Sequence, residues 1–343
     1  MNRTTFICLS ILFVFTPLLA LSQIKASSSD EILNSIKTRK AHEETSLLKD
    51  YEVRCIGPVV MSGRITDIVV NPNNIKHFYV GFASAGIFET WNNGASFKPI
   101  FDNYGALGIG DLAISQSNPK ILYAGTGENN SSRSSYAGSG IYRSDDSGQS
   151  WKHLGLTNTQ HISKIIIHPT NPEIVWVASI GALYSENKER GVYKSTDGGK
   201  TWNQTLFVSE SVGIIDLVIH PTDPKKLWAS SWERNRKAWH FDGDGIGTAI
   251  YHSSDGGTTW AKSMNGLPGN EKNGRIGLAI SKSNPDVLFA VMDNQEEFKE
   301  DEEEMDTTKI ILKDLVEISV EDFSKLDSKK LDTLLKDKGF PKE

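Results

Sequence analysis

The sequence is poor in cysteine, and it has no excess of positive charge. Its 343 residues include 2 cysteines, and 37 Lys and Arg stand against 43 Asp and Glu, for a net charge of −6. This charge balance excludes a globally basic nucleic-acid-binding protein. The two cysteines exclude a disulfide-rich scaffold. With 38% hydrophobic and 23% charged residues, the composition is that of a soluble globular protein, and wholesale disorder is excluded as well.

Long hydrophobic runs are also absent, except for one near the N-terminus from Phe6 to Leu21. Arg3 precedes this run, and small residues at 20–22 follow it, a pattern typical of a signal peptide over residues 1–22. An uncleaved membrane anchor is the alternative, but Pro17 breaks the run, which is short for the roughly 20 residues of a spanning helix. We therefore expect export to the periplasm, the cell surface or the extracellular space, with no stable membrane span after cleavage.

Cysteine chemistry contributes little under this interpretation. Cys8 would leave with the signal peptide, and Cys55 would then have no partner for an intrachain disulfide. Cys55 lies in an apolar stretch, where a lone cysteine is far more often a small core residue than a nucleophile. Stability must therefore come from packing.

The acidity of the chain belongs to its C-terminal end. Residues 296–343 carry 9 Lys and Arg against 16 Asp and Glu, or −7, which leaves +1 for residues 1–295. The acidic run predicts a solvated linker at 296–307. A leucine pattern after Asp327, closed by Gly339, predicts a helical tail over 308–343. Residues 23–50 are predicted to be a helical or linker segment.

The most informative feature is a repeat in the middle of the chain, with the pattern S-x-D-x-G-x-[ST]-W. Three copies share these positions: Ser144, Asp146, Gly148 and Trp151; Ser195, Asp197, Gly199 and Trp202; Ser253, Asp255, Gly257 and Trp260. A decayed fourth copy lies upstream at residues 90–97, with Asn92 for the aspartate and Phe97 for the tryptophan. Repeats with a period of about 50 residues indicate propellers or arrays.

A second sequence feature recurs once in each repeat unit. Four prolines are each followed four residues later by an aromatic residue: Pro119, Pro172, Pro224 and Pro285 by Tyr123, Trp176, Trp228 and Phe289. Each unit therefore reads as the four-stranded antiparallel blade of a β-propeller. In the third unit the strands are predicted at 162–167, 174–179, 191–195 and 202–207. The predicted fold is all-β, with about four and a half blades over residues 51–295 and a short helical C-terminal tail.

The repeated aspartates are interpreted as turn fasteners. An Asp side chain in a hairpin turn accepts nearby backbone N–H groups, and glycine provides the positive φ that the turn needs. The alternative is a metal site, because Asp-Gly loops can resemble a calcium loop. An EF-hand needs several oxygen ligands ending in a glutamate at position 12, and that spacing is missing. We predict no metal and no cofactor.

These motifs carry a resemblance. The repeats look like the Asp boxes, or bacterial neuraminidase repeats, of sialidases, of xyloglucanase-type glycoside hydrolases and of sortilin-type receptors. The segments at 55–58, 62–65 and 125–129 resemble exported bacterial proteins with a sortilin-type N-terminal domain, which are often labelled glycosyl hydrolases. The resemblance covers roughly residues 51–295. It implies a propeller that binds a peptide, protein or glycan ligand, with glycoside hydrolysis of extracellular polysaccharide as the alternative.

Ligand-binding residues are expected on the loops between the second and third strands of each blade, because these loops open on one face of the propeller. They lie at 126–139, 184–190 and 231–248. Aromatic rings can stack on ligands and arginine can hold carboxylates. On this basis the candidates are Arg133, Tyr136, Trp232, Arg234, Arg236, Trp239 and His240. The alternative is a loop that packs on itself. For Arg64 and Arg275, a structural pairing is favoured over ligand contact.

The enzyme hypothesis requires two carboxyl groups roughly 5–10 Å apart. The candidates are Glu128 together with Glu233 or Asp242. The resemblance to xyloglucanases implies an aspartate in an early blade, where residues 82–86 contain no acid. The resemblance to sialidases implies an arginine triad, which the sequence does not identify.

The fifth unit is short of a full blade. It provides two predicted strands at 275–280 and 287–291 and then runs into the acidic linker without a further Asp box. Propellers hide their strand edges by closing into a ring. The sequence therefore predicts a truncated product or gene fragment, or a chain that a partner completes.

Overall fold

The computed structural model describes residues 25–51, 63–269, 271–296, 310, 315 and 318–339. The chain divides into two units, Met1–Gln295 and Glu296–Glu343, which are described separately. The predicted signal peptide, Cys55 and the linker from 297 to 307 lie outside the described residues.

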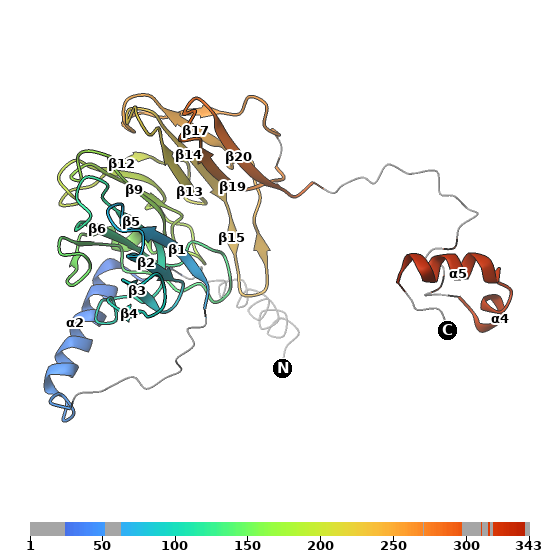
Figure 1. Cartoon of the computed structure of the whole chain (residues 1–343), viewed down its shortest axis with the longest axis horizontal. Helices are drawn as coiled ribbons and strands as arrows, with labels where there is room; N and C mark the ends of the chain where they lie inside the picture. Colours follow the sequence, from blue (N-terminus) through green and yellow to red (C-terminus); the bar gives the residue numbers. More distant parts are fainter. Residues whose placement is uncertain are drawn as a thin grey trace, which may run out of the picture. The chain divides into compact units, whose positions relative to one another are not determined.

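Four antiparallel sheets of four strands follow one another along the first unit (Figure 1). Blade 1 contains β1 (Ile65–Val70), β2 (Phe78–Phe82), β3 (Gly86–Thr90) and β4 (Lys98–Pro99). Blade 2 contains β5 (Ile109–Ile114), β6 (Leu122–Thr126), β7 (Ile141–Ser144) and β8 (Lys152–His153). Blade 3 contains β9 (Ile162–Ile167), β10 (Val175–Ser179), β11 (Gly191–Ser195) and β12 (Asn203–Leu206), after the short 3-10 helix η1 (Thr157–Thr159). Blade 4 contains β13 (Val212–Ile219), β14 (Leu227–Glu233), β17 (Ile250–Ser253) and β18 (Ala261–Ser263).

Two smaller sheets complete the unit. Half-blade 5 is the pair β19 (Asn273–Ile280) and β20 (Leu288–Asn294). A hairpin of β15 (Asn235–Arg236) and β16 (Phe241–Asp242) projects between β14 and β17 (Figure 1). The predicted all-β fold with about four and a half blades is confirmed, and the strands of blade 3 begin within one residue of their predicted positions.

The first strands of successive blades lie side by side, and aspartate side chains join them. The register between first and second strands shifts directly before these aspartates, as a β-bulge does when it redirects a side chain. Each carboxylate accepts a backbone N–H from the next blade: Asp67 from Leu112 at 3.1 Å, Asp111 from Ile165 at 2.8 Å and Asp216 from Leu278 at 2.8 Å. The blades are thus connected along their inner strands.

Blade 3 departs from this arrangement because Lys164 takes the place of the aspartate. The ammonium group of Lys164 lies 2.9 Å from Asp111 Oδ1 of blade 2, and this contact raises the pKa of Lys164. The ammonium group of Lys164 cannot accept a hydrogen bond. The N–H of Leu217 in blade 4 therefore donates to Asp216 Oδ1 of its own strand. The inner wall therefore carries one positive charge among its acids.

A second set of contacts joins the blades further out. Aromatic residues of the second strands donate to carbonyl oxygens in the repeat turn of the next blade: Tyr79 to Ser147 at 3.1 Å, Tyr123 to Gly198 at 3.1 Å and Trp176 to Gly256 at 2.9 Å. The interfaces are apolar around these bonds, and most of the residues that fill them are buried. The two sequence features, the aromatic residue after each proline and the repeat turn, therefore recur together because they contact each other between blades.

The repeat turns have the hydrogen bonds that were predicted for a turn fastener. Asp197 accepts from the Ser195 hydroxyl at 2.8 Å and from the Thr201 N–H at 2.9 Å. The glycine of each copy has positive φ, and its N–H donates to the serine hydroxyl at 2.8 Å. The decayed copy forms the same turn, because Asn92 accepts from the hydroxyl of Thr90 at 3.0 Å and from the N–H of Ser96 at 2.9 Å.

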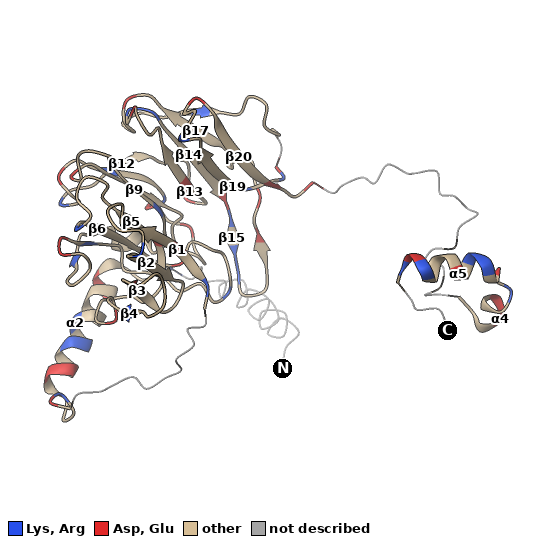
Figure 2. Cartoon of the chain, viewed as in Figure 1, with Lys and Arg blue, Asp and Glu red and all other residues tan. Residues whose placement is uncertain are grey.

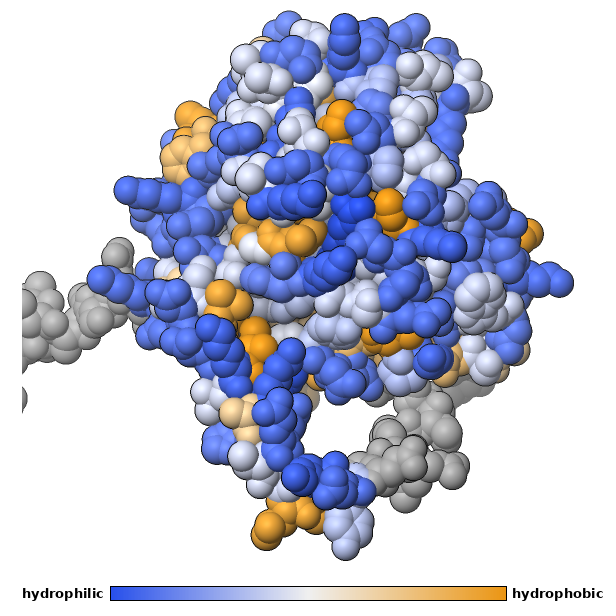
Figure 3. Space-filling model, turned by 90° about the vertical axis from the view of Figure 1, so that its left-hand side faces the viewer, coloured by the Kyte–Doolittle hydropathy of each residue, from blue (hydrophilic) through white to orange (hydrophobic). Residues whose placement is uncertain are grey.

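Helix α2 (Ser29–Thr45) is capped by Ser28, which forms a capping box with Glu31. The helix is fastened to the blades by polar contacts, since Ser29 donates to Asn158 Oδ1 at 2.8 Å and Arg39 to Asn103 O at 3.3 Å. On the face that Figure 3 displays, hydrophobic side chains form small separate groups within a mainly hydrophilic surface. None of the helices in the described part of the chain has the length and apolar character of a membrane span.

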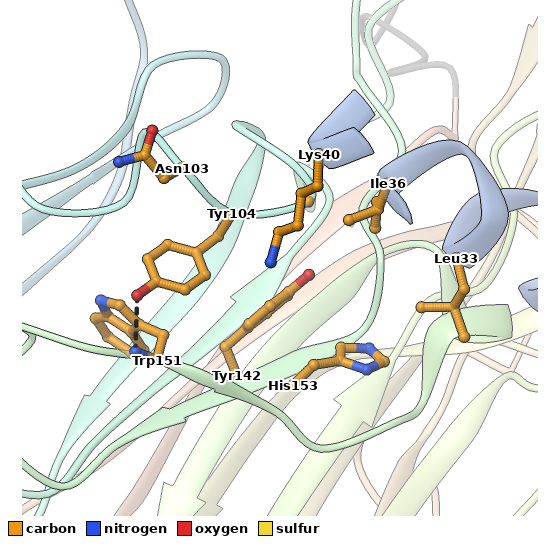
Figure 4. Close-up of a pocket in the computed structure, with 9 residues that line it drawn as sticks. Leu33, Ile36, Lys40, Asn103, Tyr104, Tyr142, Trp151 and His153 are labelled. Atoms are coloured by element: carbon orange, nitrogen blue, oxygen red, sulfur yellow. Dashed lines mark hydrogen bonds between the residues drawn. The ribbon is translucent and has the colours of Figure 1, made fainter. Parts of the chain in front are cut away.

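A pocket of about 160 Å³ lies between α2 and the first two blades (Figure 4). Its lining is mainly aromatic and apolar: Leu33, Ile36, Lys40, Asn103, Tyr104, Gly105, Tyr142, Trp151 and His153. Lys40 points toward the rings of Tyr104 and Tyr142 (Figure 4). Leu33, Ile36 and Lys40 belong to α2, so this helix forms part of the pocket wall.

In the second unit, the described residues form the helices α4 (Val320–Phe323) and α5 (Ser328–Asp337). Asp327 caps α5, because its carboxylate accepts the N–H of Lys329 at 2.9 Å. Gly339 follows the helix with φ of 76°, a common way for a helix to end.

Candidate functional site

Glu128, one of the predicted catalytic residues, forms a bidentate ion pair with Arg64. Its side chain is fully buried, and Arg64 Nε and Nη2 each donate to a carboxylate oxygen at 2.7 Å. Burial favours the neutral acid, but the hydrogen bonds from Arg64, Asn130 and Ser135 outweigh this effect and lower the pKa of Glu128. The lowered pKa favours the charged carboxylate, which suits an ion pair with Arg64.

Asn130 extends this pair to a second arginine. Its Nδ2 donates to Glu128 Oε1, and its Oδ1 accepts from Arg275 Nη1, both at 3.0 Å. Arg64 comes from blade 1, Glu128 and Asn130 from blade 2, and Arg275 from half-blade 5. The pairing that the sequence favoured for the two arginines is present, and it links distant parts of the chain.

Trp232 is buried, so the prediction of an exposed ring for stacking is wrong. Only 5% of the residue is exposed, and its indole N–H donates to Gly243 O at 2.7 Å. The reason is that β14 continues through Trp232, which pairs with Gly213 of β13. The guanidinium carbons of Arg234 and Arg275 each lie 5.7 Å from the centre of its ring.

Arg234 is also buried, with 3% exposed, where an accessible ligand contact was predicted. Its Nη1 donates to Ser131 Oγ, its Nη2 donates to Gly181 O at 3.2 Å, and its Nε has no partner among the described residues. Burial and the charges of Arg190 and Arg275 lower the pKa of Arg234 well below its usual range. We name the group of Arg64, Glu128, Asn130, Trp232, Arg234 and Arg275 the arginine cluster.

Two buried residues beside the cluster were not predicted. His161 Nδ1 lies 2.8 Å from Glu128 O, and burial, together with the charge of Arg234, lowers the pKa of His161 to about 3. Burial lowers the pKa of Arg190 to about 10, and its guanidinium donates to the carbonyls of Ala182 and Ser211. Both residues contact loops that are distant in the sequence, so no local sequence pattern indicates that they are buried.

The remaining candidates of the 231–248 loop lie on or near the β15–β16 hairpin. Glu233 Oε2 accepts the N–H of Gly247 at 2.8 Å, and Asp242 lies 2.7 Å from His240. Arg236 stacks over Phe241. Trp239 is 83% exposed at the turn. Figure 2 shows the basic side of this hairpin on β15 and an acidic residue on β16.

Arg133 and Tyr136 lie on the exposed rim of the 126–139 loop. The carbonyl of Tyr136 accepts the N–H of Glu128 at 3.2 Å, so the backbone of Tyr136 lies directly beside the arginine cluster. The hydroxyl of Tyr184, from blade 3, donates to Arg133 O at 2.9 Å. The loops of blades 2 and 3 that were predicted to form one face are thus in contact.

The three predicted catalytic carboxylates have three different partners, namely an arginine, a backbone N–H and a histidine. Ser131 and Arg234 bring the loop of Glu128 next to the end of β14, which carries Glu233. Within the described residues, no group of three or more His, Cys, Asp or Glu side chains is arranged to hold a metal.

The fold and the turn motif define a β-propeller with sortilin-like blades. The chain belongs to the Sortilin-Vps10 family: the model described as sortilin, neurotensin receptor 3, matches residues 139–330, more than half of the 343 residues.

Several solved structures are similar in fold. An ancestral GH74 enzyme has 19% identity and a TM-score of 0.49, with 68% of this chain and 31% of that chain covered. The GH74 xyloglucanase from Xanthomonas campestris has 17% identity and a TM-score of 0.48, with 66% and 35% covered. YCF48 bound to D1 peptide has 18% identity and a TM-score of 0.42, with 70% and 64% covered. The chain therefore spans about a third of the length of the two GH74 structures. No curated protein sequence matches it.

Proposed function

We propose that this chain is an exported interaction module that binds a peptide, protein or glycan ligand with the loops around the arginine cluster. The observation that carries the proposal is the charge of the cluster. Three guanidinium groups converge there, and Glu128 is the one carboxylate bonded to them among the described residues. A buried cation without a counter-ion is costly, so an anionic ligand group is a fitting partner for this end of the propeller.

Two of the guanidinium groups are accessible to a ligand. The Arg64 side chain is 49% exposed although two of its nitrogens bind Glu128. Arg275 is partly buried and uses Nη1 for Asn130. Arg234 lies behind them and adds positive charge without reaching the surface. We expect a ligand anion to contact Arg275 and Arg64, with Arg133 and Tyr136 on the rim beside it.

The proposal is tested by screening the purified chain against glycans and peptides, followed by titration of any ligand with the Arg275→Ala variant. Loss of an ion-paired arginine is expected to weaken binding about tenfold or more. Lys262→Ala is the matched control, because it removes one positive charge from an exposed position on β18. Equal affinity of both variants and the wild type, or no ligand in either library, would contradict the proposal.

Glycoside hydrolysis is the second candidate. The contact between Ser131 and Arg234, which places the loop of Glu128 next to the strand end that carries Glu233, favours it. The lowered pKa of Glu128 suits a nucleophile or base rather than a general acid, so Glu233 or Asp242 would have to donate the proton.

A further inference from the structure

The pocket between α2 and the first two blades has an aromatic wall on the side of the blades (Figure 4). The ring centres of Tyr104 and Tyr142 lie 6.1 Å apart, and those of Tyr142 and His153 lie 5.1 Å apart. Trp151 adds a further large ring. This wall is part of the core, because only 4% of Tyr142 and 7% of Trp151 is exposed. An aromatic ligand can therefore stack on it or meet it edge to face.

The polar atoms of this wall already have partners within the blades. The Tyr142 hydroxyl lies 2.8 Å from Ser139 Oγ. The Tyr104 hydroxyl accepts the backbone N–H of Trp151 at 3.0 Å, the contact drawn as a dashed line in Figure 4. The indole N–H of Trp151 donates to Gly148 O at 3.1 Å. The three rings therefore offer mainly apolar surface to an occupant of the pocket.

The helix side of the pocket contributes apolar groups and a lysine. Leu33, Ile36 and Lys40 line it from the same face of α2, and the first two are partly buried. Lys40 points toward the tyrosine rings (Figure 4), and within the described residues no carboxylate pairs with its ammonium group. The neighbouring Arg39, by contrast, pairs with Glu43 at 3.4 Å. The pocket thus combines an apolar lining with one unpaired lysine.

The volume of the pocket limits the size of its occupant. It measures about 160 Å³, close to the roughly 150 Å³ of an engineered apolar cavity in another protein that binds benzene. We propose that this pocket binds a small aromatic carboxylate. Its ring would pack against Tyr104 and Tyr142, and its carboxylate would pair with Lys40. None of the lining residues belongs to the arginine cluster, so this inference is independent of the ligand proposed there.

Such a ligand would fasten α2 to the blades. None of the residues of this helix is buried, and the hydrogen bonds that hold it are at the surface. The helix comes close to the blades at Gly105, where an added side chain would collide with Ile36 and with the Tyr142 hydroxyl. A ring in the pocket would bury apolar surface of Leu33 and Ile36 against the aromatic wall. Binding of the ligand and docking of α2 therefore stabilise each other.

The test is to titrate the full chain at neutral pH with benzoate, and with benzyl alcohol as an uncharged probe of similar size. We expect saturable binding of benzoate with a Kd of about 1 mM or tighter. Hydrogen exchange of the α2 amides is expected to slow when benzoate binds. Lys40→Met should weaken benzoate binding about fivefold, the size of a partly exposed ion pair, and leave benzyl alcohol unaffected. Lys37→Met is the matched control, because Lys37 is exposed on the same helix and does not line the pocket.

Gly105→Ala provides a second variant that acts on the shape of the pocket. Gly105 does not have positive φ, so alanine fits its backbone, while the added methyl group would press on Ile36 and the Tyr142 hydroxyl. Both probes are expected to lose affinity. The proposal is overturned if benzoate does not bind saturably, or if binding slows exchange only outside α2. It is also overturned if Lys40→Met binds benzoate as tightly as Lys37→Met, or if folded Gly105→Ala binds it as tightly as the wild type.

Discussion

Arg64 of blade 1 and Glu128 of blade 2 are joined by two hydrogen bonds of 2.7 Å, and the carboxylate is buried while the guanidinium is half exposed. The two partners therefore differ in what their removal leaves behind. Without Arg64, a buried charge loses its counter-ion. Without Glu128, the half-exposed guanidinium of Arg64 can form hydrogen bonds with water instead.

This asymmetry predicts the order of two stability changes. Arg64→Ala is expected to lower the free energy of unfolding by about 2 kcal/mol, since it leaves the Glu128 carboxylate buried and unpaired. Glu128→Gln is expected to cost about 1 kcal/mol, because the amide still accepts a hydrogen bond. Urea unfolding of both variants measures the difference, and the reverse order would show that burial of Glu128 is not the dominant effect.

The repeat turns predict a loss of stability in acid. Hydrogen bonds from the side chain and backbone of Thr201, together with Ser195, lower the pKa of Asp197 from 3.8 to about 2. A carboxylate with a lowered pKa stabilises the fold at pH values above its unfolded pKa, and this contribution is lost as pH falls through the folded pKa. The melting temperature is therefore expected to fall between about pH 4 and pH 2.

Asp197→Asn provides the control for this pH dependence. Asn92 already forms the equivalent turn with an amide, so the substitution is compatible with the fold. The variant is expected to have a shallower decline of melting temperature over the same pH range. Identical profiles for variant and wild type would mean that other carboxylates cause the acid transition.

Two lysines at salt bridges should differ strongly in importance. Lys164 pairs with Asp111, whose side chain is 3% exposed, while Lys152 pairs with Asp145 at the surface. Lys164→Met is expected to lower the free energy of unfolding by about 3 kcal/mol, because it leaves a buried carboxylate without its cation. Lys152→Met is expected to change it by less than about 0.5 kcal/mol. Similar effects in chemical denaturation would contradict this account of the inner wall.

The enzyme alternative has a direct test. The purified chain is expected to leave aryl glycosides and xyloglucan intact if it is a binding module. Hydrolysis that disappears in both Glu128→Gln and Glu233→Gln would instead support the glycoside hydrolase. Since Glu128→Gln also affects stability, circular dichroism of each variant must accompany the assay.

Much of the fold could be predicted from the sequence because the repeat turn is local. Ser195, Asp197 and Gly199 bond within four residues of one another, so their spacing alone carries the structure. The aromatic residues of the second strands recur at the same spacing as the repeat turns because each of them contacts the turn of the next blade.

The candidate site was harder to predict because its contacts are not local. Trp232 and Arg234 are buried because β14 extends to Glu233 and because loops of blades 2 and 3 close over them. Arg234 contacts Ser131, 103 residues away. Hydrophobic periodicity predicts the buried and exposed faces of a single strand, and it does not predict a contact between two residues far apart in the sequence. The same limit explains why His161 and Arg190 were missed.

The fastening of helix α2 has a consequence for the order of assembly. Ser29 is synthesised before its partner Asn158, which is 129 residues further along the chain. None of the 17 residues of the helix is buried, so by itself it has little packing to stabilise it. It must wait until blade 2 and the start of blade 3 have left the ribosome. The helix is thus positioned only after the later-made surface that receives it exists.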